Sequence, residues 1–173
     1  MSTKFFNNGP GNTLFDKLKG IASGMATFDR FLAVVGFFRS SGYFKLRKEL
    51  GDISEIKILV GINIDDIFRK HNKALLMLAD EDKAKEIYYN GFKEDIVNAQ
   101  YSPEVEEGIL QMCEDLVSGR LQMRIHATKN LHAKFYLCLP QNHSEHSDGW
   151  VIMGSSNISD SGLGIKQPPQ YEL

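Results

Sequence analysis

The stretch Phe31-Leu-Ala-Val-Val-Gly-Phe-Phe38 is short, continuously apolar and bounded by Arg30 and Arg39. A run of this kind is typical of a strand that is buried on both faces of a sheet. Farther along the chain, Glu55-Ile-Lys-Ile-Leu-Val-Gly-Ile62 has the same apolar character. The two runs therefore predict two buried strands, with room for a helix between them.

Apolar residues recur at helical spacing before, between and after these strands. Asn12 or Thr13 can cap the first helix, and Ser40 and Ser41 can cap the second, because their side-chain oxygens accept hydrogen bonds from the first helical N–H groups. Gly119 is expected to end the last helix. The predicted helices cover residues 12–26, 40–50 and 104–117, and residues 66–100 are helical in two or more pieces, since Gly91 interrupts the pattern.

The last third of the chain changes to a period of two, which indicates strands. Residues 121–125 alternate apolar and polar side chains, and apolar segments follow at residues 131–139 and 149–153. The connection at residues 140–148 is polar, so the last two strands are expected to form an antiparallel hairpin. Together these patterns predict an α/β fold in which a mixed β-sheet is flanked by helices.

The chain has 173 residues, which suits one domain with a substantial core better than two. Residues 1–11 are polar and rich in Gly and Asn, so we expect a flexible N-terminus followed by a single domain over residues 12–173. The formal charge of −2 excludes a strongly basic coat protein. Any contact with nucleic acid must therefore use a local basic surface.

The sequence favours a cytoplasmic protein that has no membrane segment. No apolar run is long enough to span a bilayer, and the N-terminus lacks the apolar stretch of a secretory signal. Cys113 and Cys138 both lie in apolar periodic segments. We interpret them as buried free thiols in a reducing compartment.

Chemistry-bearing side chains gather around the predicted hairpin. If residues 131–139 form a strand, alternation places His132 and Lys134 on the same face. The next strand ends at Gly154-Ser155-Ser156-Asn157, a turn with two hydroxyls, an amide and backbone N–H groups. Pairing of the two strands would bring an imidazole, an ammonium and neutral donors into one pocket. Such a pocket suits a phosphoryl group, with a nitrogen nucleophile directed at phosphorus.

Each half of this pattern alone is weak evidence, since His-x-Lys arises often by chance and Gly-Ser-Ser-Asn is usually only a turn. The conjunction in consecutive strands is what favours a site. His143 and His146, beside Glu145 and Asp148, superficially resemble a metal-binding tract. No Cys or further His is spaced to complete it, so a solvated loop is favoured, and we expect neither a metal nor another cofactor.

These motifs resemble the phospholipase D-like (HKD) superfamily, whose members share His-x-Lys followed by Gly-Ser-x-Asn. The closer resemblance is to its single-motif nuclease branch, and within it to the domain found N-terminal to superfamily-two helicases. The resemblance covers most of residues 14–173. The matching text is Leu131-His-Ala-Lys-Phe-Tyr-Leu137, Gly149-Trp-Val-Ile-Met-Gly-Ser-Ser-Asn-Ile-Ser159 and Ser161-Gly-Leu163, with the upstream runs Phe31–Phe38, Ser41-Gly42 and Ile56–Asn63.

The resemblance implies roles for individual residues. His132 would attack phosphorus to form a phosphohistidine, while Lys134, Ser155 and Asn157 would hold the non-bridging oxygens. Glu172 stands where relatives often have an acidic residue that orients the histidine, although a solvated residue near a chain end is an equal alternative. The superfamily's fuller signature has an Asp five residues after the Lys, and Leu139 occupies that position here. Candidate substrate contacts are Arg39 and Lys129, beside predicted strand ends, and Ser156 of the turn.

The leading hypothesis is a metal-independent phosphodiesterase that acts on DNA, as the nuclease domain of a helicase or restriction-type protein. One alternative is a non-catalytic nucleic-acid-binding or dimerisation module of a larger helicase, and another is a lipid phosphodiesterase. The chemistry requires two imidazoles and the chain offers one His-x-Lys, so we expect a homodimer with a shared active site. We also expect that the chain is the N-terminal part of a longer protein, with a helicase motor in the same polypeptide.

Overall fold

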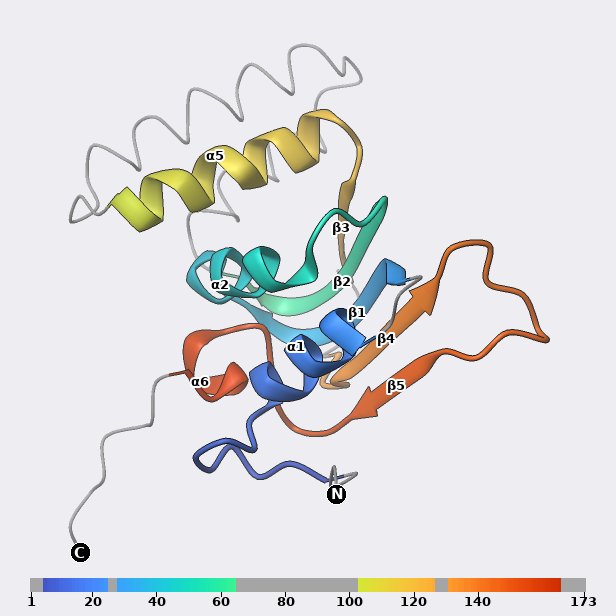
Figure 1. Ribbon diagram of the computed structural model, residues 1–173. Helices are drawn as coiled ribbons and strands as arrows, with labels where there is room; N and C mark the ends of the chain where they lie inside the picture. The colour runs from blue at the N-terminus through green and yellow to red at the C-terminus, as the bar shows by residue number, and fades with distance from the viewer. Residues whose placement is uncertain (1–4, 25–27, 65–102, 127–130, 166–173) are drawn as a thin grey trace, which may run out of the picture.

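The computed structural model describes residues 5–24, 28–64, 103–126 and 131–165, and within them the chain has an α/β fold (Figure 1). The strands form one five-stranded sheet in the order β3-β2-β1-β4-β5. They are β1 (Phe28–Phe38), β2 (Glu55–Ile64), β3 (Leu121–Ile125), β4 (Phe135–Pro140) and β5 (Trp150–Met153). The described helices are α1 (Leu14–Gly24), α2 (Ser40–Leu50), α5 (Pro103–Val117) and α6 (Asp160–Leu163).

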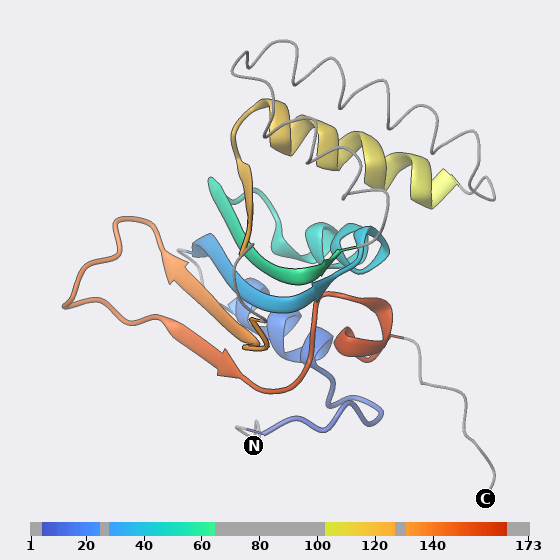
Figure 2. The ribbon, with the colours of Figure 1, turned by 180° about the vertical axis from the view of Figure 1, so that it is seen from behind.

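The sheet is mixed, as the sequence predicts. Strands β1, β2 and β3 run parallel, β4 pairs antiparallel with β1, and β5 pairs antiparallel with β4 (Figure 2). Val34 is opposite Phe135, and Phe135 is opposite Met153. The end of β1, the start of β4 and the end of β5 therefore meet at one edge of the sheet. The segment before the predicted hairpin, at residues 131–134, and the turn after it, at residues 154–157, therefore lie close to the end of β1.

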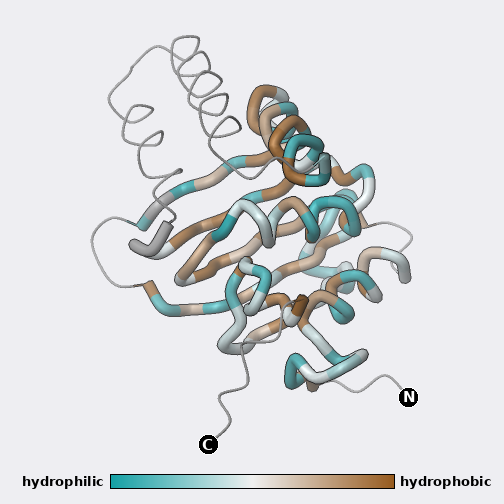
Figure 3. The backbone as a smooth tube through the Cα atoms, turned by 90° about the vertical axis from the view of Figure 1, so that its left-hand side faces the viewer, coloured by the Kyte–Doolittle hydropathy of each residue, from teal (hydrophilic) through white to brown (hydrophobic). Residues whose placement is uncertain are grey.

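One face of the sheet packs against the helices. Phe31, Ala33 and Val35 of β1 are buried in a single hydrophobic core that includes residues of α1, α2 and α5. Leu32, Val34 and Phe37 of the same strand are only partly buried, so the prediction that β1 is buried on both faces was wrong for these residues. Figure 3 shows hydrophobic segments along the central strands and along α5. In the part of the chain described, no helix combines the length and apolar character needed to cross a membrane.

The helix ends follow the sequence in one case and depart from it in another. Thr13 caps α1, because Asp16 N donates to its Oγ1 (3.0 Å) and its own N–H donates to Asp16 Oδ2 (2.9 Å). The predicted Ser40 or Ser41 cap on α2 was wrong, since the N-cap is Arg39, without a side-chain cap. Arg39 stays extended because its N–H donates to Ile158 O (2.8 Å), so the chain passes from strand to helix without an intervening turn.

Other local predictions are confirmed where they can be compared. Gly119 follows α5 with a positive φ of 76°, a conformation that favours glycine. Cys113 and Cys138 are buried and free, and burial raises the pKa of Cys113 to about 11 and that of Cys138 to about 12. Both thiols are therefore protonated near neutral pH. The helical pieces predicted over residues 66–100 lie outside the described residues.

A fully buried carboxylate joins α2 to α5. Asp115 accepts hydrogen bonds from Arg47 Nε (2.7 Å), the Tyr43 hydroxyl (3.0 Å) and Arg120 (3.0 Å). Burial alone would raise the pKa of Asp115, but the hydrogen bonds and charge of its partners outweigh burial and hold it below the ordinary value. This cluster fixes α2, which follows directly from the end of β1.

We expect Asp115→Ala to lower the free energy of unfolding by about 3–5 kcal/mol, because it leaves the Arg47 guanidinium buried without its partner. Because the pKa of Asp115 is lower in the folded state, its contribution is present above the ordinary Asp range and is lost as pH falls through the folded-state pKa. Denaturant titrations at neutral and acidic pH measure both effects.

Glu107→Ala is the matched control, since the Lys48–Glu107 ion pair joins the same two helices in an exposed position. It should leave the unfolding midpoint essentially unchanged. Equal destabilisation by the two substitutions would contradict the assigned importance of the buried cluster.

Candidate active site

Two glycines allow the chain before β4 to cross close above β1 and β2. A Cβ added at Gly61 would lie 2.5 Å from the Leu131 carbonyl oxygen and 3.0 Å from the Gly36 oxygen. A Cβ at Gly36 would lie 3.4 Å from the same Leu131 oxygen. The β1–β2 register shifts at this level, between Val35 and Phe37. Glycine is thus required at position 61 for the close approach of one backbone to another, whereas a Cβ at Gly36 would make an ordinary van der Waals contact.

This crossing segment carries the predicted His-x-Lys pair. Strand β4 begins at Phe135, so both residues precede it, and the prediction that strand alternation unites them was wrong. The side chains meet because Lys134 turns back: its Nζ donates to the His132 carbonyl (2.7 Å) and contacts His132 Nδ1 (2.9 Å). Lys134 is 5% exposed, whereas His132 is exposed. The ammonium is therefore held inside while the imidazole lies at the surface.

The contact between the two residues defines the tautomer of the imidazole. A lysine ammonium has three N–H donors and no acceptor. At 2.9 Å the His132 Nδ1 must accept from it, which places the proton of a neutral imidazole on Nε2. Burial lowers the pKa of Lys134 from its ordinary value.

The turn after β5 crosses the start of β4 and reaches β1. Gly154 N donates to Lys134 O (3.2 Å), and Phe38 forms an isolated parallel bridge with Ile158. Between these points, Asn157 Oδ1 accepts from the backbone N–H groups of Gly36 and Phe37, both at 3.0 Å. The side chain of Asn157 therefore takes the place of a strand partner for the end of β1.

Lys134 and Asn157 converge on the space left by a missing side chain. A Cβ at Gly36 would lie 3.5 Å from both Lys134 Nζ and Asn157 Oδ1. Among the described residues, no acceptor takes the third N–H of Lys134 or the Nδ2 group of Asn157. The Leu131 carbonyl oxygen also faces this space, but the free groups on the two side chains are donors and one of them is cationic, so these two side chains can bind an anion.

The other predicted site residues are placed in different ways. Ser155 is exposed in the turn, directly before Ser156, which is buried. The Ser156 hydroxyl accepts from Asn8 Nδ2 (3.3 Å) and its carbonyl accepts from the Tyr136 hydroxyl (2.6 Å), so this residue anchors the turn to the core. Lys129 and Glu172 lie outside the described residues.

The backbone of Arg39 lies beside the site, next to the residue that follows Asn157. Its N–H pairs with the residue after Asn157, and its guanidinium donates to Phe38 O (3.3 Å). Leu139, by contrast, pairs with Arg30 near the far end of β4. Five residues of strand separate it from Lys134 by roughly 16 Å, at about 3.3 Å per residue. The Asp missing at this position could not touch the Lys134 ammonium.

Close backbone packing holds the turn in place. A Cβ at Gly42 of α2 would lie 2.7 Å from Ser159 Cα, and one at Gly162 of α6 would overlap the Asn157 backbone. Sequence reasoning noticed these glycines only as part of a resemblance. It missed Gly36, Gly61 and the anchoring role of Asn8. A glycine inside each of two apolar strand runs was the available signal.

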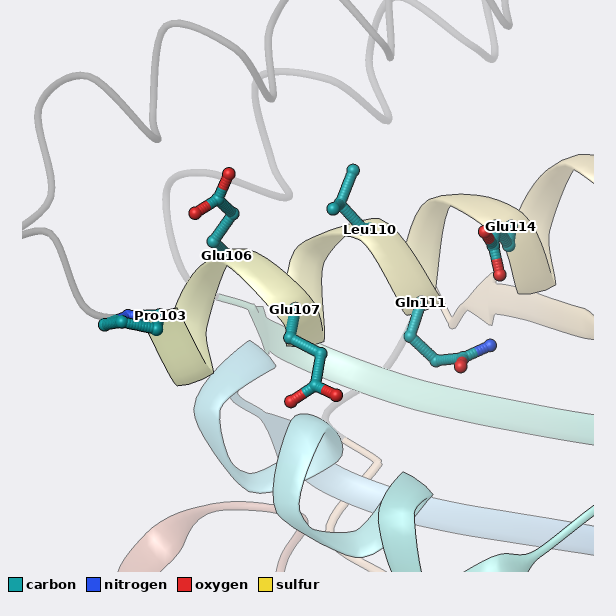
Figure 4. Close-up of a pocket in the computed structure, with 6 residues that line it drawn as sticks. All are labelled: Pro103, Glu106, Glu107, Leu110, Gln111 and Glu114. Atoms are coloured by element: carbon teal, nitrogen blue, oxygen red, sulfur yellow. The ribbon is translucent and has the colours of Figure 1, made fainter.

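Two other surfaces are less suited to phosphate. His143 contacts the Ser147 hydroxyl (2.9 Å) and His146 faces Glu145 (3.3 Å) in an exposed loop. No group of three His, Cys, Asp or Glu side chains that could hold a metal ion occurs within the described ranges. A hollow of about 290 Å³ on α5 is lined by three glutamates, which would repel an anion (Figure 4).

Neither the protein-family models nor the curated proteins contain a match for this chain. Its chemistry must therefore be argued from its own residues. The groups available for this chemistry are the buried ammonium of Lys134, the exposed imidazole of His132 and the amide of Asn157 at the end of β1.

Asn157→Ala should lower the free energy of unfolding by about 1–3 kcal/mol, because it leaves the N–H groups of Gly36 and Phe37 without an acceptor. Asn157→Asp retains an acceptor oxygen and should destabilise much less, yet it replaces the amide donors with a negative charge beside Lys134. Denaturant titration together with phosphate binding by calorimetry separates the two effects. Equal stability of both variants would contradict the contact with β1.

Proposed function

We propose that this chain is a metal-independent phosphodiesterase of the phospholipase D-like class that acts on DNA. The observation that carries the proposal is the buried Lys134 ammonium, which contacts His132 and converges with Asn157 at Gly36. A phosphodiester presents oxygens that need donors and a phosphorus that accepts a nitrogen nucleophile. The resemblance of His-x-Lys and Gly-Ser-x-Asn to that class supports the same chemistry.

In this proposal the phosphate lies over Gly36. The free N–H of Lys134, Nδ2 of Asn157 and the hydroxyl of Ser155 hold its non-bridging oxygens. Nε2 of His132 forms a bond to phosphorus as the bond to the leaving oxygen breaks, and that oxygen takes a proton from a second imidazole. Water then attacks the phosphohistidine, gives its proton to the second imidazole and regenerates His132.

The contact between Lys134 and Nδ1 gives the substrate a part in activating His132. While Lys134 donates to Nδ1, the proton of the neutral ring is on Nε2 and the attacking lone pair is absent. A phosphate that draws Lys134 away frees Nδ1 to carry the proton. A carboxylate can then hold that proton, and Glu172 is the candidate by resemblance.

Cleavage of a DNA oligonucleotide in the presence of a chelator tests the proposal. His132→Asn should abolish cleavage and leave DNA binding largely intact, because it removes the nucleophile but little volume. Lys134→Ala should lose cleavage and also weaken phosphate binding. His143→Asn is the matched control, since this exposed histidine lies in the β4–β5 connection.

Wild-type cleavage by His132→Asn would refute the mechanism, and activity lost in chelator and restored by magnesium would indicate another class of nuclease. A chain that binds DNA without cutting it would instead be the non-catalytic module. Cleavage of phospholipid but not DNA would favour the lipid phosphodiesterase.

The second imidazole is proposed to come from a second copy of the chain. A two-fold axis would bring His132, Lys134 and Asn157 of both chains to one shared site. The other candidate for the second imidazole, within one chain, is His126. It follows β3 at the same edge of the sheet, where its N–H donates to Val60 O (2.8 Å). A helicase motor in the same polypeptide is a further proposed partner by resemblance.

Mixing His132→Asn with wild type distinguishes the two sources of the acid. In a shared-site dimer, activity should fall with the square of the wild-type fraction, because mixed dimers are inactive. The measurement is the cleavage rate after the mixture has exchanged subunits, with sedimentation to verify a dimer. Linear dilution by an active monomer, together with loss of cleavage in His126→Asn, would place the acid within one chain and refute the shared site.

A further inference from the structure

A groove of about 780 Å³ lies between α1, the N-terminal segment and β5, and its lining extends to Gly154 and Ser155 of the turn. Trp150 and Met153 of β5 belong to this lining and are 56% and 72% exposed. The groove thus reaches the turn that carries Ser155 and continues as an apolar, aromatic surface along β5, the last strand of the sheet.

The walls of the groove leave room for a flat ligand. On the side of α1, Gly20 and Gly24 line it, and a Cβ added at either would meet no atom within 4 Å. On the opposite side, β5 pairs with β4 alone, so its outer backbone N–H and C=O groups have no strand partner in the part of the chain described. These groups can exchange hydrogen bonds with a polar ring edge.

We infer that this groove binds unpaired nucleotides next to the scissile phosphate, which makes single-stranded nucleic acid the substrate class. The inference rests on the proposed function, because the phosphate is held at Lys134 and the neighbouring nucleoside must pass Ser155. Bases of every kind stack on an exposed aromatic side chain, and Trp150 offers one in the groove, roughly 13 Å along the hairpin from Lys134 because it pairs with Cys138. A base in a duplex has its faces covered by its neighbours and cannot stack in this way.

Charge around the groove is compatible with a phosphate backbone. Lys17 belongs to the lining and supplies a positive charge. The Asp16 carboxylate also lies there, but it accepts hydrogen bonds from the Thr13 N–H (2.9 Å) and hydroxyl (2.8 Å), which spread its charge into the helix cap. The groove therefore differs from the acidic hollow on α5 (Figure 4).

Trp150 is the single tryptophan of the chain, so fluorescence excited at a wavelength that the six tyrosines do not absorb reports on this groove alone. A short oligothymidylate should quench it, and the same strand with abasic positions should quench it far less. Trp150→Leu should weaken binding of a labelled oligothymidylate about tenfold or more, and Trp150→Phe should restore most of the affinity. Leu110→Ala, at an exposed apolar residue of α5, is the control and should bind as wild type.

Bis(p-nitrophenyl) phosphate separates this inference from the proposed function, because it has a phosphodiester but no nucleobase. Trp150→Leu should lower cleavage of an oligothymidylate by a larger factor than cleavage of this small diester, whereas His132→Asn should cleave neither. Wild-type chain that fails to cleave the small diester refutes the proposed function, while quenching by oligothymidylate still supports the groove. Unchanged fluorescence at saturating oligonucleotide, equal binding of abasic strands, or quenching only by phospholipid vesicles would overturn the inference.

Discussion

The site depends on the approach of one backbone to two others. The Leu131 carbonyl lies against Gly61 so closely that a single added carbon there would displace it, and Gly36 lies beneath the same oxygen. Because His132 and Lys134 follow within three residues, the position of the imidazole and the ammonium is set by this crossing. Close packing of this kind leaves little room for adjustment, since protein interiors accommodate extra volume poorly. Gly61 is therefore as much a part of the candidate site as the side chains of His132 and Lys134.

A hydrogen-bond requirement of the sheet is met by a residue of the site. Strand β4 covers β1 only as far as Val34, which leaves the N–H groups of Gly36 and Phe37 without a strand partner on that side. Asn157 accepts from both, and the same contact aims its amide nitrogen away from the backbone. Buried backbone donors are costly to leave unpaired. The stability of β1 and the proposed recognition of a ligand thus both depend on the Asn157 side chain. Close backbone packing at Gly42 and Gly162 keeps this residue in place.

Much of the fold could be predicted, because periodicity is a local property of the sequence. The two apolar segments on either side of the polar connection predict the β4–β5 hairpin, and the hairpin brings the turn at Gly154 to Lys134. The start of β4 could not be predicted, since it depends on Lys134 turning back to His132 instead of extending the strand. Nor could the role of Gly36 and Gly61 be derived, because a glycine in a strand indicates a close approach without indicating which segment approaches.

One structural element links the two proposed binding surfaces. Strand β5 places Trp150 and Met153 along the groove, and the turn that follows it carries Ser155 and Asn157 to β1. A ligand that spans both surfaces therefore contacts one continuous piece of chain, paired on its inner edge with β4 and docked at its end on the parallel strands. Because β4 begins directly after Lys134, any shift of the hairpin would move the phosphate donors and the stacking surface together. In the proposed function, a nucleotide strand bound along β5 would therefore reach the imidazole in a fixed register.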